Sequence, residues 1–153
     1  MKTGIIFYSQ TGHTRLAAQK LLEALKKKGQ DAELLEVKVS NQKPEANASL
    51  IHFTNKPEVD VYDRLVFAAQ VWGFSLSGVM KAYLAGISSL KGKKISLFVT
   101  HHLPLAWMGG NKAIRQMKTL CEVKSGDVVS HAVISWSEKR REHDIIEMVK
   151  KLA

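Results

Sequence analysis

The stretch that decides the fold spans residues 5–28 and reads IIFYSQTGHTRLAAQKLLEALKKK. It begins with an unbroken run of β-branched and aromatic residues at 5–8, which predicts a strand buried on both faces. A loop rich in hydroxyl side chains follows at 9–14, and apolar residues then recur at helical spacing until Gly29. We therefore predict a central strand, a polar loop and an amphipathic helix in direct succession.

The same order of strand and helix recurs along the rest of the chain. Further strands are predicted at residues 32–39, 65–69, 95–99 and 128–136, and helices at residues 77–90, around Ile114 to Cys121, and around Ile145 to Leu152. The strand at 32–39 is expected at a sheet edge, and Ser135 with Glu138 fits a capping box ahead of the last helix. Residues 40–62 are expected to form a loop with a short helical turn. The alternation predicts an α/β fold with three layers and a doubly wound sheet of five parallel strands, in a single domain over residues 1–153.

The chain is strongly basic, with 23 Lys and Arg against 14 Asp and Glu and a formal charge of +9. Thirteen basic and six acidic side chains lie in residues 77–153, so the excess is concentrated there. Such a field favours anionic partners, among them phosphate esters, acidic proteins, nucleic acid and anionic membrane surfaces.

The single cysteine, Cys121, is expected to be a buried hydrophobe in a protein of the reducing cytoplasm. No apolar run suits a signal sequence or a membrane span, so we expect no membrane insertion.

Three loops follow predicted parallel strands and are expected to meet at one edge of the sheet, at residues 9–14, 70–75 and 100–110. The first loop offers hydroxyl groups and backbone amides to an anion at the positive end of a helix, and Gly12 lets the chain approach closely. It has neither the lysine of a nucleoside triphosphate loop nor the glycine pattern of a dinucleotide site, so a monophosphate suits it better. The alternative is a loop that only turns the chain and caps the helix.

Residues 9–14, coming after a first hydrophobic strand, resemble the phosphate loop of flavodoxins, which holds the FMN phosphate without a basic side chain. Residues 62–73 resemble the third strand of that family with the flavin-contacting loop behind it, and residues 90–100 resemble its fourth strand. The resemblance implies the sheet order 2-1-3-4-5 and non-covalently bound FMN, with no catalytic side chain and no metal. The residues it places around the cofactor are Ser9, Gln10, Thr11, Gly12, His13, Thr14, Gln70, Val71, Trp72, Gly73, Phe74, Thr100, His101 and His102.

Several positions depart from the flavodoxin pattern. Ala68-Ala69-Gln70 stands where many relatives have a small residue, Ser or Thr, and then Pro, and His13 stands where Asn is frequent. The loop after Thr100 lacks the Gly-Asp pattern of electron-transferring flavodoxins. Trp72 could stack on a flavin ring or pack within its loop, and Trp107 could act as a lid or a partner contact.

The expected function is electron transfer through FMN, with an acidic redox protein as the partner because this chain is basic. The positive field is also expected to stabilise the reduced, anionic flavin. Two alternatives stay open: an NAD(P)H-dependent FMN reductase of quinones or other small molecules, and a flavin-free basic module that binds an acidic protein or, less favoured, nucleic acid. A phosphorylation-signalling receiver domain is excluded, because Ser9, Gln10 and Gln70 occupy the positions of its acidic residues. The oligomeric state also stays open.

Overall fold

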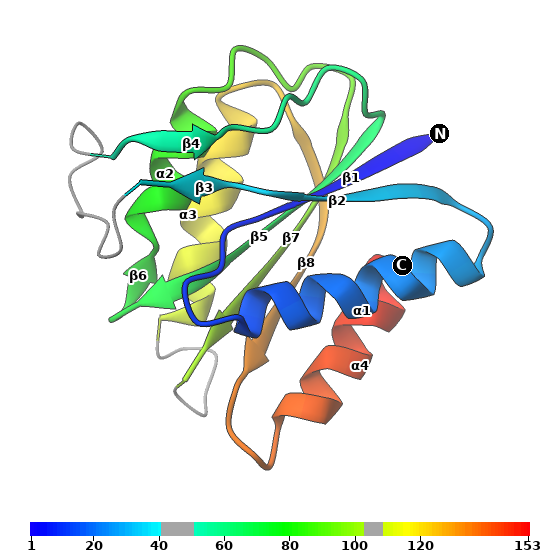
Figure 1. Cartoon of the computed structure of the whole chain (residues 1–153), viewed down its shortest axis with the longest axis vertical. Helices are drawn as coiled ribbons and strands as arrows, with labels where there is room; N and C mark the ends of the chain where they lie inside the picture. The colour runs from blue at the N-terminus through cyan, green and yellow to red at the C-terminus, as the bar shows by residue number, and fades with distance from the viewer. Residues whose placement is uncertain (41–50, 103–108) are drawn as a thin grey trace.

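The sheet at the centre of the molecule has five parallel strands. In this computed structural model the described residues are 1–40, 51–102 and 109–153. The strands are β1 (Lys2–Phe7), β2 (Asp31–Glu36), β5 (Arg64–Trp72), β7 (Lys94–His101) and β8 (Asp127–Ser135). They pair in the order β2-β1-β5-β7-β8, which confirms the predicted order 2-1-3-4-5. Because all five strands run the same way, their carboxyl ends lie along one edge of the sheet (Figure 1).

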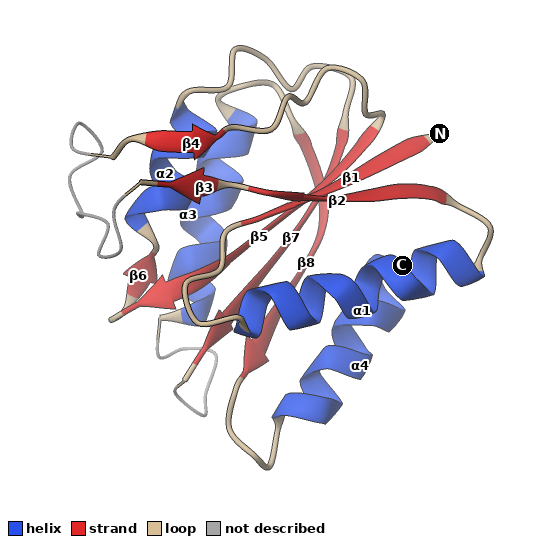
Figure 2. Ribbon diagram, viewed as in Figure 1, coloured by secondary structure: helices blue, strands red, loops and turns tan. Residues whose placement is uncertain are grey.

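Two helices pack on each face of the sheet, α1 (His13–Lys27) and α4 (Arg141–Leu152) on one face and α2 (Gly78–Ala85) and α3 (Gly110–Glu122) on the other (Figure 2). The alternation of side chains along a strand explains why both layers form. Ile5 and Phe7 of β1 belong to the core beneath α1 and α4, whereas Ile6 belongs to the core beneath α2 and α3. A strand buried on both faces needs an uninterrupted apolar run, and the predicted three-layer fold is confirmed.

β2 is an edge strand, as predicted, but it ends at Glu36 rather than continuing to residue 39. The backbone N–H of Val37 donates to the carbonyl oxygen of Phe7 at 2.8 Å, and the chain then enters β3 (Lys38–Val39). This strand pairs antiparallel with β4 (Phe53–Asn55) in a separate two-stranded sheet. The expected loop with a helical turn at 40–62 therefore contains β4, while its residues 41–50 lie outside the described residues.

A short hairpin extends the third strand of the sheet at its carboxyl end. β5 continues to Trp72, past the predicted end at residue 69, and folds back as β6 (Ser75–Leu76). Trp72 lies opposite Ser75 in the antiparallel pair, and Gly73 takes a φ of +61° at the turn. The second of the three expected loops is therefore the tip of a hairpin, which gives its residues fixed directions.

Two predictions about helix ends are wrong. The helix expected at 77–90 ends at Ala85 and is followed by Gly86, although Leu90 stays buried because the next loop also packs on the core. The capping box is absent because α4 begins at Arg141, and Ser135 is the last residue of β8. The backbone N–H of Ser135 donates instead to Asp144 Oδ2 at 2.9 Å, which joins the strand end to the first turn of α4.

Cys121 is fully buried on the inner side of α3, as predicted. Burial, assisted by the neighbouring charge of Glu122, raises the pKa of its thiol to about 12. The thiol is therefore inert at neutral pH and serves as a small hydrophobe. Within the described ranges, no helix has both the length and the apolar character needed to cross a bilayer.

Candidate functional site

A cavity of about 280 Å³ opens at the carboxyl ends of β1, β5 and β7. Its described lining comes from the three loops expected to meet there, and every lining residue is among those predicted from the sequence: Gln10, Thr11, His13, Gln70, Val71, Trp72, Gly73, Thr100, His101 and His102. The other four predicted residues lie outside that lining: Ser9, Gly12 and Phe74 are in the same loops, with Phe74 exposed, and Thr14 is buried in the first turn of α1. The fold thus brings the three loops together around one cavity.

The first loop is a tight turn that ends on the N-terminus of α1. Ser9 Oγ accepts a hydrogen bond from the backbone N–H of Gly12 at 3.0 Å, and Gly12 occupies the N-cap with a φ of +92°. None of the described side chains caps α1, and its first turn contains no acidic residue. The positive end of the helix dipole therefore faces this loop without a carboxylate to offset it, which suits an anion.

A buried hydroxyl pair joins the first loop to the third. Thr14 Oγ1 and Thr100 Oγ1 lie 2.8 Å apart, and both residues are buried. Either oxygen can donate, and the hydroxyl that accepts within the pair keeps its own O–H as a donor. The pair fixes the spacing between α1 and the end of β7, which are 86 residues apart in the sequence.

The amide side chains of Gln10 and Gln70 join the first loop to the second. The backbone N–H of Gln10 donates to Gln70 Oε1 at 3.1 Å, and Gln70 Nε2 donates to Gln10 Oε1 at 3.2 Å. The carbonyl oxygen of Gln70 also accepts from the backbone N–H of Ser77 at 3.1 Å. These hydrogen bonds hold Gln70, which stands where many flavodoxins have Pro, to the first loop and to the start of α2.

The hairpin presents Trp72 to the cavity. Its ring meets the edge of Tyr8 with a centroid separation of 6.3 Å and an interplanar angle of 82°. Trp72 Nε1 is buried and has no hydrogen-bond partner among the described residues. Gly109, which sequence reasoning did not single out, brings the start of α3 against this hairpin, because a Cβ there would lie 2.8 Å from Cα of Phe74.

His101 supplies a second unpaired polar group on the same cavity. The residue is buried, and neither ring nitrogen has a hydrogen-bond partner in the described part of the chain. The pKa of this imidazole is lowered, mainly because the ring is buried. The carboxylate of Asp144 acts in the opposite direction, and His102 adds a further lowering. Buried polar atoms are nearly always hydrogen-bonded in folded proteins, so Trp72 Nε1 and His101 mark a place where a ligand could supply the missing partners.

An aromatic stack at the rim brings in a fourth segment that sequence reasoning missed. His13 stacks on Trp136, with ring centroids 4.4 Å apart and an interplanar angle of 13°, and His102 meets His13 edge-on at 5.2 Å. The guanidinium carbon of Arg141 lies 5.4 Å from the centroid of Trp136. Burial, then the nearby His102 and Arg141, lowers the pKa of His13. One signal in the sequence could have identified this segment. Trp136 comes directly after β8, and the residues that follow parallel strands meet at the same edge of the sheet.

No protein-family model matches the sequence, and no curated protein matches it. Solved structures do match over nearly the whole chain. A flavoprotein from Lactobacillus acidophilus NCFM, solved in complex with FMN, is 20% identical with a TM-score of 0.67, covering 96% of this chain and 97% of that one. A flavodoxin from Streptococcus pneumoniae TIGR4 is 18% identical with a TM-score of 0.67 and coverages of 99% and 97%. Oxidised Flavodoxin 2 from Bacillus cereus is 16% identical with a TM-score of 0.65 and coverages of 98% and 94%. At these identities the likeness establishes a flavodoxin-like fold.

Proposed function

We propose that this chain binds FMN non-covalently and transfers electrons through it between redox partners. The observation that carries the proposal is the cavity itself, which joins an uncapped helix N-terminus to two buried polar groups without partners among the described residues. The fold supports it, since a structure of the same fold holds FMN. Bound FMN would supply the redox chemistry, and the protein would supply position and electrostatics.

The first loop has the chemistry to hold a phosphate ester. Backbone amides at the start of α1 are free of side-chain caps within the described residues, and the hydroxyls of Thr11 and Thr14 lie in the same segment. The described lining of the cavity includes no Asp or Glu, so a doubly charged phosphate meets no like charge there. Main-chain amides and hydroxyls can therefore bind the anion without a lysine, as at other helix N-termini.

The second and third loops have the chemistry to hold a heteroaromatic ring. A flavin carries carbonyl oxygens and ring nitrogens along one edge, which can accept from Trp72 Nε1–H and pair with the imidazole of His101. The indole also offers a rigid apolar surface beside the cavity. The residues present therefore fit a flavin, which would supply hydrogen-bond partners for Trp72 Nε1 and the ring nitrogens of His101.

The charge of the cavity suits a cofactor that becomes more negative on reduction. Arg141 places a positive charge beside the His13–Trp136 stack at the rim, with its guanidinium carbon 5.4 Å from the centroid of the Trp136 ring. A cationic surrounding favours an anionic bound group by Coulomb attraction. The acidic redox partner expected from the net charge of +9 belongs to the same proposal.

The test is a titration of the purified chain with FMN and, in parallel, with riboflavin, followed by fluorescence and absorption. We expect FMN fluorescence to be quenched at micromolar concentrations, and riboflavin, which lacks the phosphate, to bind at least about tenfold more weakly. A protein that leaves FMN fluorescence unchanged would overturn the proposal and favour the flavin-free module. Anaerobic addition of NADPH then separates the two redox functions, because direct bleaching of the flavin favours the reductase and an unchanged spectrum favours the carrier.

A further inference from the structure

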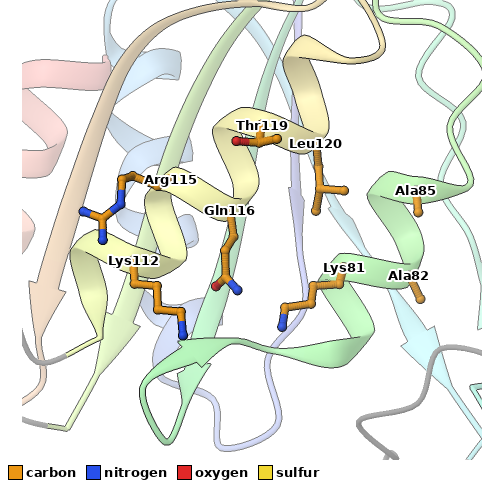
Figure 3. Close-up of a pocket in the computed structure, with 8 residues that line it drawn as sticks. All are labelled: Lys81, Ala82, Ala85, Lys112, Arg115, Gln116, Thr119 and Leu120. Atoms are coloured by element: carbon orange, nitrogen blue, oxygen red, sulfur yellow. The ribbon is translucent and has the colours of Figure 1, made fainter.

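A second hollow, which shares no lining residue with the cavity, lies between α2 and α3 on the outer side of that helical layer (Figure 3). It measures about 740 Å³, is open to solvent, and is lined by Lys81, Ala82, Ala85, Lys112, Arg115, Gln116, Thr119 and Leu120. We propose that this α2–α3 groove docks an acidic amphipathic helix of a partner protein. The inference goes beyond the binding of FMN and does not depend on it.

Small side chains make the groove hollow. On the α2 side, the short side chains of Ala82 and Ala85 project little from the helix and leave space above it. On the α3 side, Leu120 offers a partly buried apolar surface opposite them. Gln116 stands in the middle, where its Oε1 accepts from the backbone N–H of Leu76 at 2.8 Å and its Nε2 donates to Ser75 Oγ at 2.9 Å. Because the amide of Gln116 is already bonded on both sides, it forms a fixed wall and needs no ligand.

The charges around this apolar trough have one sign. Lys81, Lys112 and Arg115 line it, and Asp and Glu are absent from its described lining. In Figure 3, Lys81 and Lys112 lie on either side of Gln116, with Leu120 and Ala85 toward the other end. Lys112 and Arg115 are exposed and form no ion pair with an acidic side chain of the described segments, whereas Arg15 pairs with Glu36.

These features favour a protein helix over other occupants. A groove between two helices, apolar along its length and cationic on its rim, suits the helix-in-groove mode, with acidic residues beside the apolar stripe of the incoming helix. A second copy docked symmetrically would place Lys112 and Arg115 against the same cations. A small amphiphile would need a more enclosed pocket, since small-molecule sites bury most of the ligand.

The groove also adjoins the hairpin of the candidate site. Lys81 Nζ donates to Ser75 Oγ at 3.0 Å, and Ser75 lies opposite Trp72 in the β5–β6 pair. A partner held here would contact the elements that brace Trp72. Such a place suits a redox partner if the chain carries FMN, although docking itself requires only the groove.

The test uses two synthetic amphipathic helices of about 15 residues, one with glutamates flanking a leucine stripe and a twin with glutamines in their place. Each is titrated into the isotopically labelled full chain and followed by NMR and calorimetry. We expect the acidic helix to shift resonances of α2 and α3 and to bind at least about tenfold more tightly than its twin, with an affinity that falls as salt is added. Equal binding of the two helices, no binding, or shifts confined to other elements would overturn the proposal.

Three variants locate the interaction. Lys112→Glu with Arg115→Glu should weaken the acidic helix by at least about tenfold, and Ala85→Trp should weaken it by filling the trough without changing charge. The matched control is Lys20→Glu with Lys91→Glu, which changes the net charge equally at exposed positions outside the groove and should leave binding unchanged. Equal weakening by the control would show that only net charge matters and would overturn the groove. FMN titration of the same proteins keeps this result separate from the flavin proposal, and binding to anionic lipid vesicles in place of the acidic helix would count against a protein partner.

Discussion

The cavity at the sheet edge and the α2–α3 groove differ in how they are built. The cavity is made by loops whose side chains bond to one another, as in the Gln10–Gln70 and Thr14–Thr100 pairs, and its described lining includes Trp72 and His101, whose buried ring nitrogens have no partner among the described residues. The groove is made by the outer surfaces of two helices, and its polar groups are bonded or exposed. Buried polar atoms demand specific partners, whereas an exposed apolar trough rewards contact area and charge. We therefore expect the cavity to select a ligand by the positions of its hydrogen-bonding atoms. The groove should select a partner by its apolar surface and its pattern of charge.

The largest expected effect comes from breaking the hydroxyl pair of the cavity. Thr14→Val leaves Thr100 Oγ1 buried without that partner, so the free energy of unfolding should fall by about 1–3 kcal/mol. Urea denaturation measures it. Thr119→Val makes the same chemical change at an exposed position of the groove and should have little effect. Equal losses in the two variants would erase the contrast between the sites.

A smaller effect is expected from straining the first loop. Gly12→Ala places a side chain at a φ of +92°, which costs roughly 1–2 kcal/mol and favours a different backbone conformation at the start of α1. FMN affinity, measured by fluorescence quenching, should fall by about tenfold. Gly92→Ala is the matched control, because Gly92 has a φ of +79° and equally open space around an added Cβ, but lies outside the cavity lining. It should lower stability and leave FMN binding unchanged.

Acid should weaken the fold through the cavity histidine. Because burial lowers the pKa of His101 in the folded protein, the unfolded chain binds more protons as the pH falls through the usual histidine range. The free energy of unfolding should therefore be lower at about pH 5.5 than at about pH 7.5. His101→Phe should reduce this difference in denaturation midpoints. An unchanged pH dependence in that variant would assign the acid sensitivity to another group, such as His131, whose pKa burial also lowers.

The smallest effect is expected on the pKa of His13, at the rim of the cavity. Burial is the main reason that the pKa of His13 is lowered, and electrostatic repulsion from His102 and Arg141 lowers it further. Arg141→Gln should therefore raise the pKa of His13, as followed by NMR across a pH series. Lys150→Gln also removes one positive charge, but near the other end of α4, and should leave the pKa of His13 unchanged. A shift of the same size in both variants would contradict a local role for Arg141.

Sequence patterns predicted most of the fold because local chemistry carries it. Continuous apolar runs marked the inner strands, and the three loops after them contained every residue in the described lining of the cavity. The same patterns failed where packing overrides local preference. Leu90 continues the apolar spacing of α2 after the helix has ended, because its burial comes from the loop that packs on the core. Trp107, the expected lid or partner contact, lies outside the described residues.

By itself, the sequence determined that strands and helices alternate, that the first strand is central, and that polar loops follow the strands, since periodicity and turn residues act over a few neighbours. Tertiary structure alone decided that Gln70 bonds Gln10, that Trp136 stacks on His13, and that α2 and α3 leave a cationic groove. These contacts join segments tens of residues apart, and no local pattern encodes which side chains will meet once the layers have packed.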